Sequence, residues 1–333
     1  MDKVKISVLG DGGWGTTLAI LLHRKGYSVT LWGAFSDYVT HLNKKRINTK
    51  FLPGIKIPRD IEITHDLKKA VLGRQLIILA IPSEHLRRIL KKIKGVHFHC
   101  PQTIFLSVTK GIEMTSLKRM SQVIHDELGA IKLAVLSGPT IAQEVARQIP
   151  TACVVASRDR KIKKYLQNIF MTGRFRIYTN DDVIGVELGG SLKNIIAIAC
   201  GISDGLGFGT NTKAAILSRG LVEMSRLGLA MGAKTKTFSG ISGLGDLVTT
   251  CISPYSRNKF VGVQIGKGRP LSRIKAHMQM IAEGVPTSKS AHTLSLKYKV
   301  DMPITKEVYL VLYKNKSPLQ AVRDLMTREG KEE

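Results

Sequence analysis

Gly10-Asp11-Gly12-Gly13-Trp14-Gly15 is the stretch of this sequence that decides the fold. Its glycines have the GxGxxG spacing, directly after an apolar strand pattern with Val4, Ile6 and Val8 and directly before a helical pattern. In that context the first glycine permits a tight turn, the second lets the backbone approach a pyrophosphate, and the third lets helix and strand pack closely. The helix N-terminus would then bind the phosphates through its unpaired N–H groups. The stretch predicts a dinucleotide-binding domain.

Short apolar strands alternate with helical stretches through residues 1–180. Strands are predicted at Val29–Trp32, Leu76–Ile81, Thr103–Val108, Leu133–Leu136 and Ala152–Ala156, with helices such as Ser83–Lys92 and Ile141–Arg147 between them. This alternation is typical of a mostly parallel sheet covered by helices. After about residue 181 helical periodicity takes over, as in Ala214, Leu217, Leu221 and Met224. We therefore expect an α/β protein: a Rossmann-type doubly wound sheet that binds NAD(P) over 1–180, and an all-α C-terminal domain over 181–333.

The chain is strongly basic, with 51 Lys and Arg against 25 acidic residues and a net charge of +26. Such a charge suits nucleic acid, an acidic membrane surface or anionic small molecules. Nucleic-acid binders concentrate their charge in a patch or tail with interleaved aromatics. Here the basic residues lie in short, scattered groups such as Lys44–Arg46, and aromatic residues are 6% of the chain. We expect no specific nucleic-acid partner and a basic surface that attracts phosphorylated ligands.

Cysteine spacing and apolar runs bear on metal sites and location. Four cysteines lie far apart without a CxxC pair: Cys100, Cys153, Cys200 and Cys251. This spacing predicts neither disulfides nor a metal site and fits a reducing compartment. The longest apolar runs, Leu76–Ile81 and Ile195–Cys200, are too short to cross a bilayer, and the N-terminal apolar stretch breaks at Asp11. We expect a cytoplasmic protein without a transmembrane segment.

The second strand has no acidic residue at its end. In NAD-selective folds an Asp or Glu about 20 residues beyond the glycines binds the ribose 2′-hydroxyl. Here the strand ends Leu31-Trp32-Gly33-Ala34, and the next acidic residue is Asp37. No arginine stands there for a 2′-phosphate either. We expect NAD or NADP as cofactor, with NADPH tolerated and even preferred, because the end of the strand carries no carboxylate to repel a 2′-phosphate.

Three polar groups in the second half of the chain have both a functional and a structural interpretation. Lys193-Asn194 precedes a run that is apolar on every face, so the helix should be buried, and a buried lysine is costly unless it is paired. The alternative is a lysine whose stem runs along the helix start to water. Asp246, after the glycine-rich Ser242–Gly245, could instead be a helix N-cap. Arg257 could clamp a phosphate bidentately or lie solvated at the surface.

Together, a series of motifs resembles the NAD(P)-dependent sn-glycerol-3-phosphate dehydrogenase family over essentially the full length. The matching stretches are Gly10–Thr16, Ile81-Pro82-Ser83, Thr109-Lys110-Gly111-Ile112, Ser137-Gly138-Pro139, Leu188–Asn194, Asp204-Gly205-Leu206-Gly207, Gly245–Thr250, Ser256-Arg257-Asn258 and Ala282-Glu283-Gly284. Several motifs in the right order are highly specific. The sequence departs from the family where Ala34 replaces a common arginine, and Thr140 and Ile141 replace a usual Ser and Phe.

The resemblance implies an enzyme that reversibly transfers hydride between NAD(P)H and dihydroxyacetone phosphate to give sn-glycerol 3-phosphate for glycerophospholipid synthesis. It implies that the C-terminal domain is catalytic, with Lys193 as general acid/base oriented by Asp246 and Thr250. The implied substrate-binding residues are Lys110, Gly138, Thr140, Lys193, Asn194, Asp246, Ser256, Arg257 and Asn258. The implied cofactor-binding residues are Gly10, Gly12, Gly13, Trp14, Gly15, Lys110, Ala142, Arg257, Ile281 and Glu283. We expect a homodimer with no metal.

Other classes of function fit parts of the sequence. A dehydrogenase of the hydroxyacid or ketopantoate type would share the architecture but act on another substrate, and the stretch from Gly245 to Asn258 argues against it. A nucleic-acid-binding protein would use the +26 charge. A catalytically dead cofactor sensor would bind NAD(P)H without turnover. The presence of acid/base and phosphate-site residues argues against both of these.

Overall fold

The computed structural model describes residues 4–96, 102–278, 280–330 and 332, so Cys100 lies outside the described residues. The chain divides into two compact units, Met1–Lys110 with Lys118–Val186, and Gly111–Leu117 with Glu187–Glu333. The expected division near residue 180 did not include the short segment Gly111–Leu117. That segment belongs to the helical unit because Ile112 is buried there and its carbonyl accepts a hydrogen bond from the Ser290 hydroxyl at 3.3 Å.

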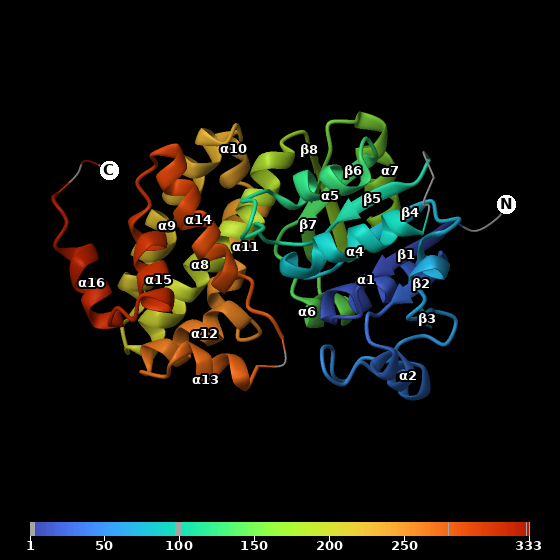
Figure 1. The fold of residues 1–333 in the computed structure, drawn as a ribbon, viewed down its shortest axis with the longest axis horizontal. Helices are drawn as coiled ribbons and strands as arrows, with labels where there is room; N and C mark the ends of the chain where they lie inside the picture. The colour runs from blue at the N-terminus through green and yellow to red at the C-terminus, as the bar shows by residue number, and fades with distance from the viewer. Residues whose placement is uncertain (1–3, 97–101, 279, 331, 333) are drawn as a thin grey trace. The chain divides into compact units, whose positions relative to one another are not determined.

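The first unit is built on an eight-stranded sheet with the order β3-β2-β1-β4-β5-β6-β7-β8 (Figure 1). The strands are β1 (Lys5–Leu9), β2 (Ser28–Trp32), β3 (Glu62–Thr64), β4 (Leu76–Leu79), β5 (Ile104–Ser107), β6 (Lys132–Ser137), β7 (Thr151–Ala156) and β8 (Phe175–Asn180). All neighbours are parallel except β6 and β7. The predicted mostly parallel sheet is confirmed. The sequence did not reveal β3, which has three residues, or β8, in which buried and exposed residues alternate.

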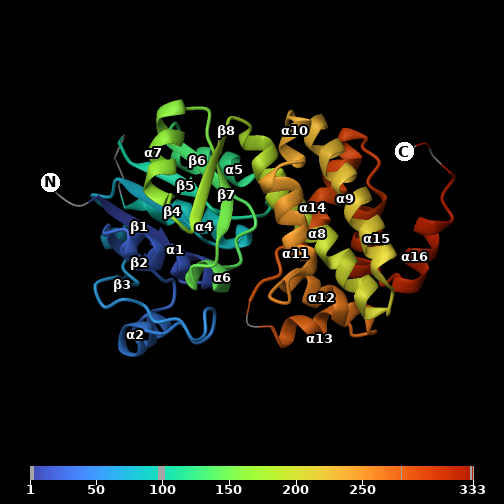
Figure 2. The same ribbon diagram turned by 180° about the vertical axis from the view of Figure 1, so that it is seen from behind.

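Helices cover both faces of this sheet (Figures 1 and 2). They are α1 (Gly13–Arg24), α2 (Ser36–Lys45), α3 (Leu67–Val71), α4 (Ser83–Gly95), α5 (Met120–Leu128), α6 (Ala142–Ala146) and α7 (Arg160–Phe170). Alternate residues of one strand serve the two faces: Ile78 packs in the cluster that contains α1 and α7, whereas Ile77 and Leu79 pack in the cluster that contains α4 and α5. Burial on both faces explains why β4 reads as an unbroken apolar run.

The second unit is helical. Its helices are α8 (Val183–Gly205), α9 (Thr210–Ala230), α10 (Thr235–Phe238), the π-helical turn η1 (Ile241–Gly245), α11 (Asp246–Ile252), α12 (Arg257–Gly266), α13 (Leu271–Ala276), α14 (Gly284–Tyr298), α15 (Pro303–Tyr313) and α16 (Pro318–Met326). In the described part of the chain, α8 is the one helix with the length and composition of a membrane span, with a mean hydropathy of 1.5. Because 83% of that apolar window is buried inside the protein, α8 is a core helix, as its sequence predicted.

A buried carboxylate caps the start of α15. Glu223 in α9 is 2% exposed, and its Oε1 accepts a hydrogen bond from the N–H of Ile304 at 2.5 Å. Its Oε2 accepts hydrogen bonds from the N–H and the hydroxyl of Thr305, at 3.0 and 2.9 Å. The first N–H groups of a helix have no partner inside the helix, so Glu223 supplies one. Burial raises the pKa of Glu223 to about 7, although these donors oppose the shift.

We expect Glu223→Gln to lower the free energy of unfolding by about 1–3 kcal/mol, because the amide would point a donor at N–H groups that need an acceptor. Chemical denaturation of the purified protein measures this, with Glu329→Gln on the exposed tail as control. The pKa of Glu223 in the folded protein lies above the ordinary glutamate value of 4.5. Ionisation of Glu223 is therefore less favourable in the folded than in the unfolded protein, so the free energy of unfolding is highest below about pH 4.5 and falls as the pH rises through about 7. In the Gln variant the free energy of unfolding should not change with pH in this range. Equal free energies of unfolding for variant and wild type would contradict the capping role of Glu223.

Candidate active site

The glycine run forms the turn between β1 and α1. Gly10 has φ +121°, and a Cβ there would lie 2.3 Å from the carbonyl oxygen of Ala80. A Cβ at Gly15 would lie 1.9 Å from the carbonyl oxygen of Gly10, so a side chain at either position would collide with backbone. Gly12 differs, because nothing lies within 4 Å of a Cβ built there. The backbone at Gly12 is thus open to a ligand, as the motif predicted.

The start of α1 suits an anionic ligand such as a pyrophosphate. The first turn of α1 contains no acidic side chain. Gly13 lies against other parts of the unit, since its Cβ would be 2.5 Å from the carbonyl oxygen of Phe51 and 3.7 Å from the Cβ of Ala142. The Nε1 of Trp14 is buried and has no hydrogen-bond partner among the described residues. An open backbone and an unsatisfied buried donor at a helix N-terminus fit the dinucleotide that the sequence predicted.

Lys110 reaches two other predicted site residues in the first unit. Its Nζ donates hydrogen bonds to the Gly138 carbonyl at 2.8 Å and to Thr140 Oγ1 at 3.5 Å. The Thr140 hydroxyl donates to the same carbonyl at 3.1 Å. Gly138 has φ +144°, and a Cβ there would lie 2.9 Å from the Cα of Cys153. These residues follow β5 and β6, and the carboxyl ends of parallel strands are where ligands bind in such folds.

Lys193, Asp246 and Thr250 form a buried group in the second unit, with exposed fractions of 5%, 1% and 6%. The Lys193 ammonium forms an ion pair with Asp246 Oδ1 and donates a hydrogen bond to Thr250 Oγ1 at 2.6 Å. The Thr250 hydroxyl itself donates to the Asp246 backbone carbonyl at 2.7 Å, which directs its oxygen lone pairs to Lys193. The alternative of a lysine extending to water is therefore wrong, because the ammonium is buried and paired.

Asp246 is positioned by a π-helical turn. The interpretation of Asp246 as an N-cap is wrong, because α11 continues out of η1 and Asp246 is its first residue. Such turns are frequent at functional sites. The turn lies close to α8: a Cβ at Gly189 would be 2.6 Å from the Ser242 carbonyl oxygen. The turn also lies close to the end of α10, because a Cβ at Gly243 would be 2.1 Å from the Phe238 carbonyl oxygen. Glycines thus let η1 approach α8 and bring Asp246 to Lys193.

Four further glycines join α8 to α12 at backbone distance. A Cβ at Gly201 would lie 2.2 Å from the Lys259 carbonyl oxygen, and one at Gly205 would lie 2.4 Å from that of Val263. The reciprocal contacts are as close, at 2.1 Å from Gly262 to the Ile198 oxygen and 2.5 Å from Gly266 to the Ile202 oxygen. The helix that carries Lys193 and the helix that carries Arg257 are therefore in direct main-chain contact.

A chain of amides links three of the family-like motifs. The Gly284 N–H donates to Asn258 Oδ1 at 2.8 Å, and Asn258 Nδ2 donates to Asn194 Oδ1 at 2.8 Å. Asn194 Nδ2 is 3.4 Å from the Gly190 carbonyl, which is a marginal hydrogen bond. A Cβ at Gly284 would lie 2.6 Å from the Asn194 carbonyl oxygen, so the start of α14 fits against α8 only as glycine. These hydrogen bonds fix the Asn258 side chain against Asn194, the residue that follows Lys193.

The remaining predicted residues of this unit lie at helix starts. The Ser256 hydroxyl caps α12 by accepting a hydrogen bond from the Lys259 N–H at 3.2 Å. Arg257 is exposed, and its Nη1 donates to the Ile281 carbonyl at 2.9 Å. Glu283 immediately precedes α14. The Ile281 contact orients the guanidinium, and desolvation lowers the pKa of Arg257 while the Glu283 carboxylate opposes the shift. The side chain still has surface that a ligand can reach.

Comparisons with known proteins agree over almost the whole chain. The model for the N-terminus of NAD-dependent glycerol-3-phosphate dehydrogenase matches residues 5–163, and that for its C-terminus matches residues 182–323. The chain belongs to this family. It is 50% identical to a glycerol-3-phosphate dehydrogenase [NAD(P)+] of Chlorobium phaeobacteroides, over 99% of both chains. It is also 50% identical to one of Thermoanaerobacter sp., again over 99% of both. The crystal structure of glycerol-3-phosphate dehydrogenase from Coxiella burnetii has a TM-score of 0.94 and 39% identity, and covers 98% of this chain and 99% of that one.

The residues predicted for this glycerol-3-phosphate dehydrogenase family member fall in both units. The first unit holds Gly10, Gly12, Gly13, Trp14, Gly15, Lys110, Gly138, Thr140 and Ala142, and the second holds Lys193, Asn194, Asp246, Thr250, Ser256, Arg257, Asn258, Ile281 and Glu283. In the described part of the chain no group of His, Cys, Asp or Glu could hold a metal ion. Cys153, Cys200 and Cys251 are buried.

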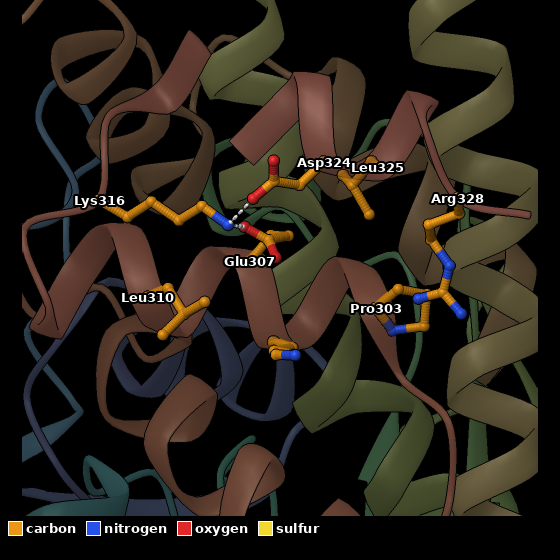
Figure 3. Close-up of a pocket in the computed structure, with 8 residues that line it drawn as sticks. Pro303, Glu307, Leu310, Lys316, Asp324, Leu325 and Arg328 are labelled. Carbon is orange, nitrogen blue, oxygen red and sulfur yellow. Dashed lines mark hydrogen bonds and ion pairs between the residues drawn. The ribbon is translucent and has the colours of Figure 1, made fainter. Parts of the chain in front are cut away.

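A cavity of about 240 Å³ lies elsewhere in the helical unit (Figure 3). Its lining includes Pro303, Glu307, Leu310, Lys316, Asp324 and Arg328. The Lys316 ammonium points at the carboxylates of Glu307 and Asp324 and forms ion pairs with them (Figure 3). None of the predicted site residues of this family member lines the cavity, so it is separate from the Lys193 group.

One acidic group was missed by sequence reasoning. The carboxyl of Asp11 lies over Gly33, directly after β2, where a Cβ at Gly33 would be 2.3 Å from Asp11 Oδ2. Burial raises the pKa of Asp11 to about 6, although Lys50 acts in the opposite direction. The rule that looks for an acid about 20 residues beyond the glycines examines the second strand. That rule therefore does not find Asp11, whose side chain reaches the end of β2 from the glycine loop.

Proposed function

We propose that the protein catalyses the reversible, NAD(P)-dependent reduction of dihydroxyacetone phosphate to sn-glycerol 3-phosphate. The observation that carries this proposal is the buried, paired Lys193 in a chain of this family. The two relatives that match this chain over 99% of their length are named glycerol-3-phosphate dehydrogenase [NAD(P)+]. A bound nicotinamide supplies the hydride chemistry, and the residues of the chain must bind, orient and protonate.

Lys193 acts as the general acid/base at the C2 oxygen. Its ammonium donates a hydrogen bond to the ketone oxygen and a proton to the alkoxide that develops there, and in the reverse direction it accepts that proton. Asp246 stabilises the charged form of a lysine that burial would otherwise neutralise. Thr250 fixes the direction of the ammonium through the 2.6 Å hydrogen bond. The buried position of all three groups strengthens these interactions because water does not screen them.

Arg257 binds the substrate phosphate through its exposed, planar guanidinium. The other substrate contacts that we propose are Lys110, Gly138, Thr140, Asn194, Asp246, Ser256 and Asn258. The cofactor would be held by Gly10, Gly12, Gly13, Trp14, Gly15, Lys110, Ala142, Arg257, Ile281 and Glu283. The open backbone of Gly12 and the unsatisfied Trp14 donor support the cofactor assignment. The amide chain that fixes Asn194 and Asn258 supports the substrate assignment.

The same proposal covers the setting of the enzyme. We propose a cytoplasmic homodimer, residues 1–180 binding cofactor and residues 181–333 binding substrate and carrying Lys193. Its product supplies the backbone for glycerophospholipid synthesis. The net charge of +26 supports attraction of a phosphorylated substrate.

One assay tests the activity: oxidation of NADH or NADPH by the purified protein with dihydroxyacetone phosphate. We expect turnover that depends on this substrate and is absent with 2-oxo acids and 2-dehydropantoate. Turnover with one of those acids, but not with dihydroxyacetone phosphate, would replace the substrate assignment. Tight binding of NADH without any turnover would favour a cofactor sensor instead.

A further inference from the structure

The end of β2 holds an acidic side chain that comes from another segment. β2 ends at Trp32 and is followed by Gly33 and Ala34, neither of which has a carboxyl group. The built Cβ of Gly33 would lie 2.3 Å from Oδ2 and 2.8 Å from Cγ of Asp11. The carboxyl of Asp11 therefore occupies the space that a side chain at position 33 would fill. Glycine at 33 leaves room for it.

The main chain of Asp11 is held in place while its carboxyl keeps an unsatisfied oxygen. The Asp11 carbonyl accepts hydrogen bonds from Asn48 Nδ2 at 2.8 Å and from the Thr16 hydroxyl at 3.3 Å. In contrast, Oδ2 is buried and accepts no hydrogen bond from any described residue. A buried oxygen without a donor is costly, and a carboxyl that turned toward a ligand hydroxyl would remove that cost. With a pKa of about 6, the carboxyl is mostly ionised at pH 7.

We propose that Asp11 selects the cofactor, accepting a hydrogen bond from the 2′-hydroxyl of the adenosine ribose of NAD and repelling the 2′-phosphate of NADP. The inference rests on the proposed function, because it names the cofactor preference of that same site. In dinucleotide-binding folds an acidic side chain at the end of the second strand accepts this hydrogen bond from the ribose 2′-hydroxyl. Here the glycine loop brings the same chemical group to the same strand end.

Charge decides the direction of the preference. A 2′-phosphate beside the Asp11 carboxylate would bring like charges together in a partly buried place, where solvent screens them weakly. Lys50 attracts the Asp11 carboxylate and is itself exposed, and the Tyr38 hydroxyl also interacts with that carboxylate. Lys50 softens the repulsion of a 2′-phosphate, so NADPH is weakened as a ligand rather than excluded. The expected preference is therefore for NADH over NADPH, the reverse of what the absence of a carboxylate in β2 itself suggested.

Binding of nucleotide fragments tests this without any turnover. Titration calorimetry measures Kd for ADP-ribose and for its 2′-phosphorylated form, with wild type, Asp11→Asn, Asp11→Ala and the control Asp37→Asn. Asp37 is the next acidic residue in the sequence, exposed in the first turn of α2. We expect wild type to bind ADP-ribose at least about tenfold more tightly than the phosphorylated form, which corresponds to about 1.4 kcal/mol.

Both Asp11 variants should reduce this ratio about tenfold or more, chiefly through tighter binding of the phosphorylated fragment. Asp11→Ala should also weaken ADP-ribose several-fold, because Asn keeps an acceptor oxygen and Ala does not. Thermal melting confirms that each variant is folded. A Kd ratio that both Asp11 variants leave unchanged, or that Asp37→Asn alters equally, would overturn the inference and leave the proposed function standing. Failure of wild type to bind either fragment or NADH would overturn both.

Discussion

Lys193→Met should reduce kcat for dihydroxyacetone phosphate by about 10²–10⁴-fold, the usual loss when a general acid is removed. Methionine keeps the length and apolar bulk of the side chain but has neither the proton nor the charge. In the buried group it would also leave Asp246 without its ion-pair partner. The change should appear in kcat rather than in KM, because the interaction strengthens as the alkoxide develops. Steady-state kinetics with NADH at saturation measures it.

The control is a second lysine of the helical unit, Lys213, which pairs with Asp204 at 2.8 Å and has no place in the proposed machinery. Lys213→Met should leave kcat within about twofold of wild type, since surface changes rarely matter. Both variants should bind NADH with the wild-type Kd, because Lys193 lies outside the glycine loop. Near-normal kcat in Lys193→Met would show that another group moves the proton.

Arg257→Ala should lower kcat/KM for dihydroxyacetone phosphate by about ten- to a hundredfold. A hydrogen bond to a charged group contributes about 1.5–3 kcal/mol, and 1.4 kcal/mol corresponds to one decade. Arg257→Lys should lose much of the same activity, because an ammonium is a point charge and lacks the planar fork. The hydrogen bond from Nη1 to the Ile281 carbonyl holds the guanidinium in one orientation. Lysine cannot reproduce this arrangement, because all of its donors are on a single nitrogen.

Unphosphorylated dihydroxyacetone shows whether the loss concerns the phosphate. Wild type should use it poorly, and Arg257→Ala should barely change that rate, so substrate and variant form a thermodynamic cycle with the phosphate as second partner. Lys259→Ala is the matched control, a cation on the same helix that donates to the Ile252 carbonyl and pairs with Asp204. Equal losses on both substrates would leave Arg257 with its proposed cofactor contact or a role in folding but no role at the phosphate, and Lys110 would become the next candidate for the phosphate.

The parts of the fold that were predictable are those in which burial imposes a local pattern. β4 is covered on both faces, so its residues must all be apolar, and α8 is buried on every side, so it reads as apolar all round. β3 and β8 could not be predicted in the same way. Three residues are too few to show a period, and an edge strand with exposed alternate residues resembles a loop.

The residues of the site also differ in how far local sequence could predict them. Lys193 was recognisable because a charge in an apolar helix is unusual, but its pairing with Asp246 joins residues 53 positions apart and needed the family resemblance or the structure. Asp11 was visible in the glycine run, yet its position over Gly33 depends on how the loop after β1 folds back on β2. Local rules describe what a segment requires, whereas a contact between segments depends on the whole fold.

The four-glycine contact between α8 and α12 has a consequence for reading mutational tolerance. Any side chain at Gly201, Gly205, Gly262 or Gly266 would separate the two helices, and with them Lys193 and Arg257. In a scan of all single substitutions these four positions should be as intolerant as Lys193, although glycine has no side chain beyond a hydrogen atom. Intolerance there measures how closely two backbones must run. A scan interpreted by rank alone would enlarge the apparent catalytic centre by four glycines that have no side chain with which to touch the substrate.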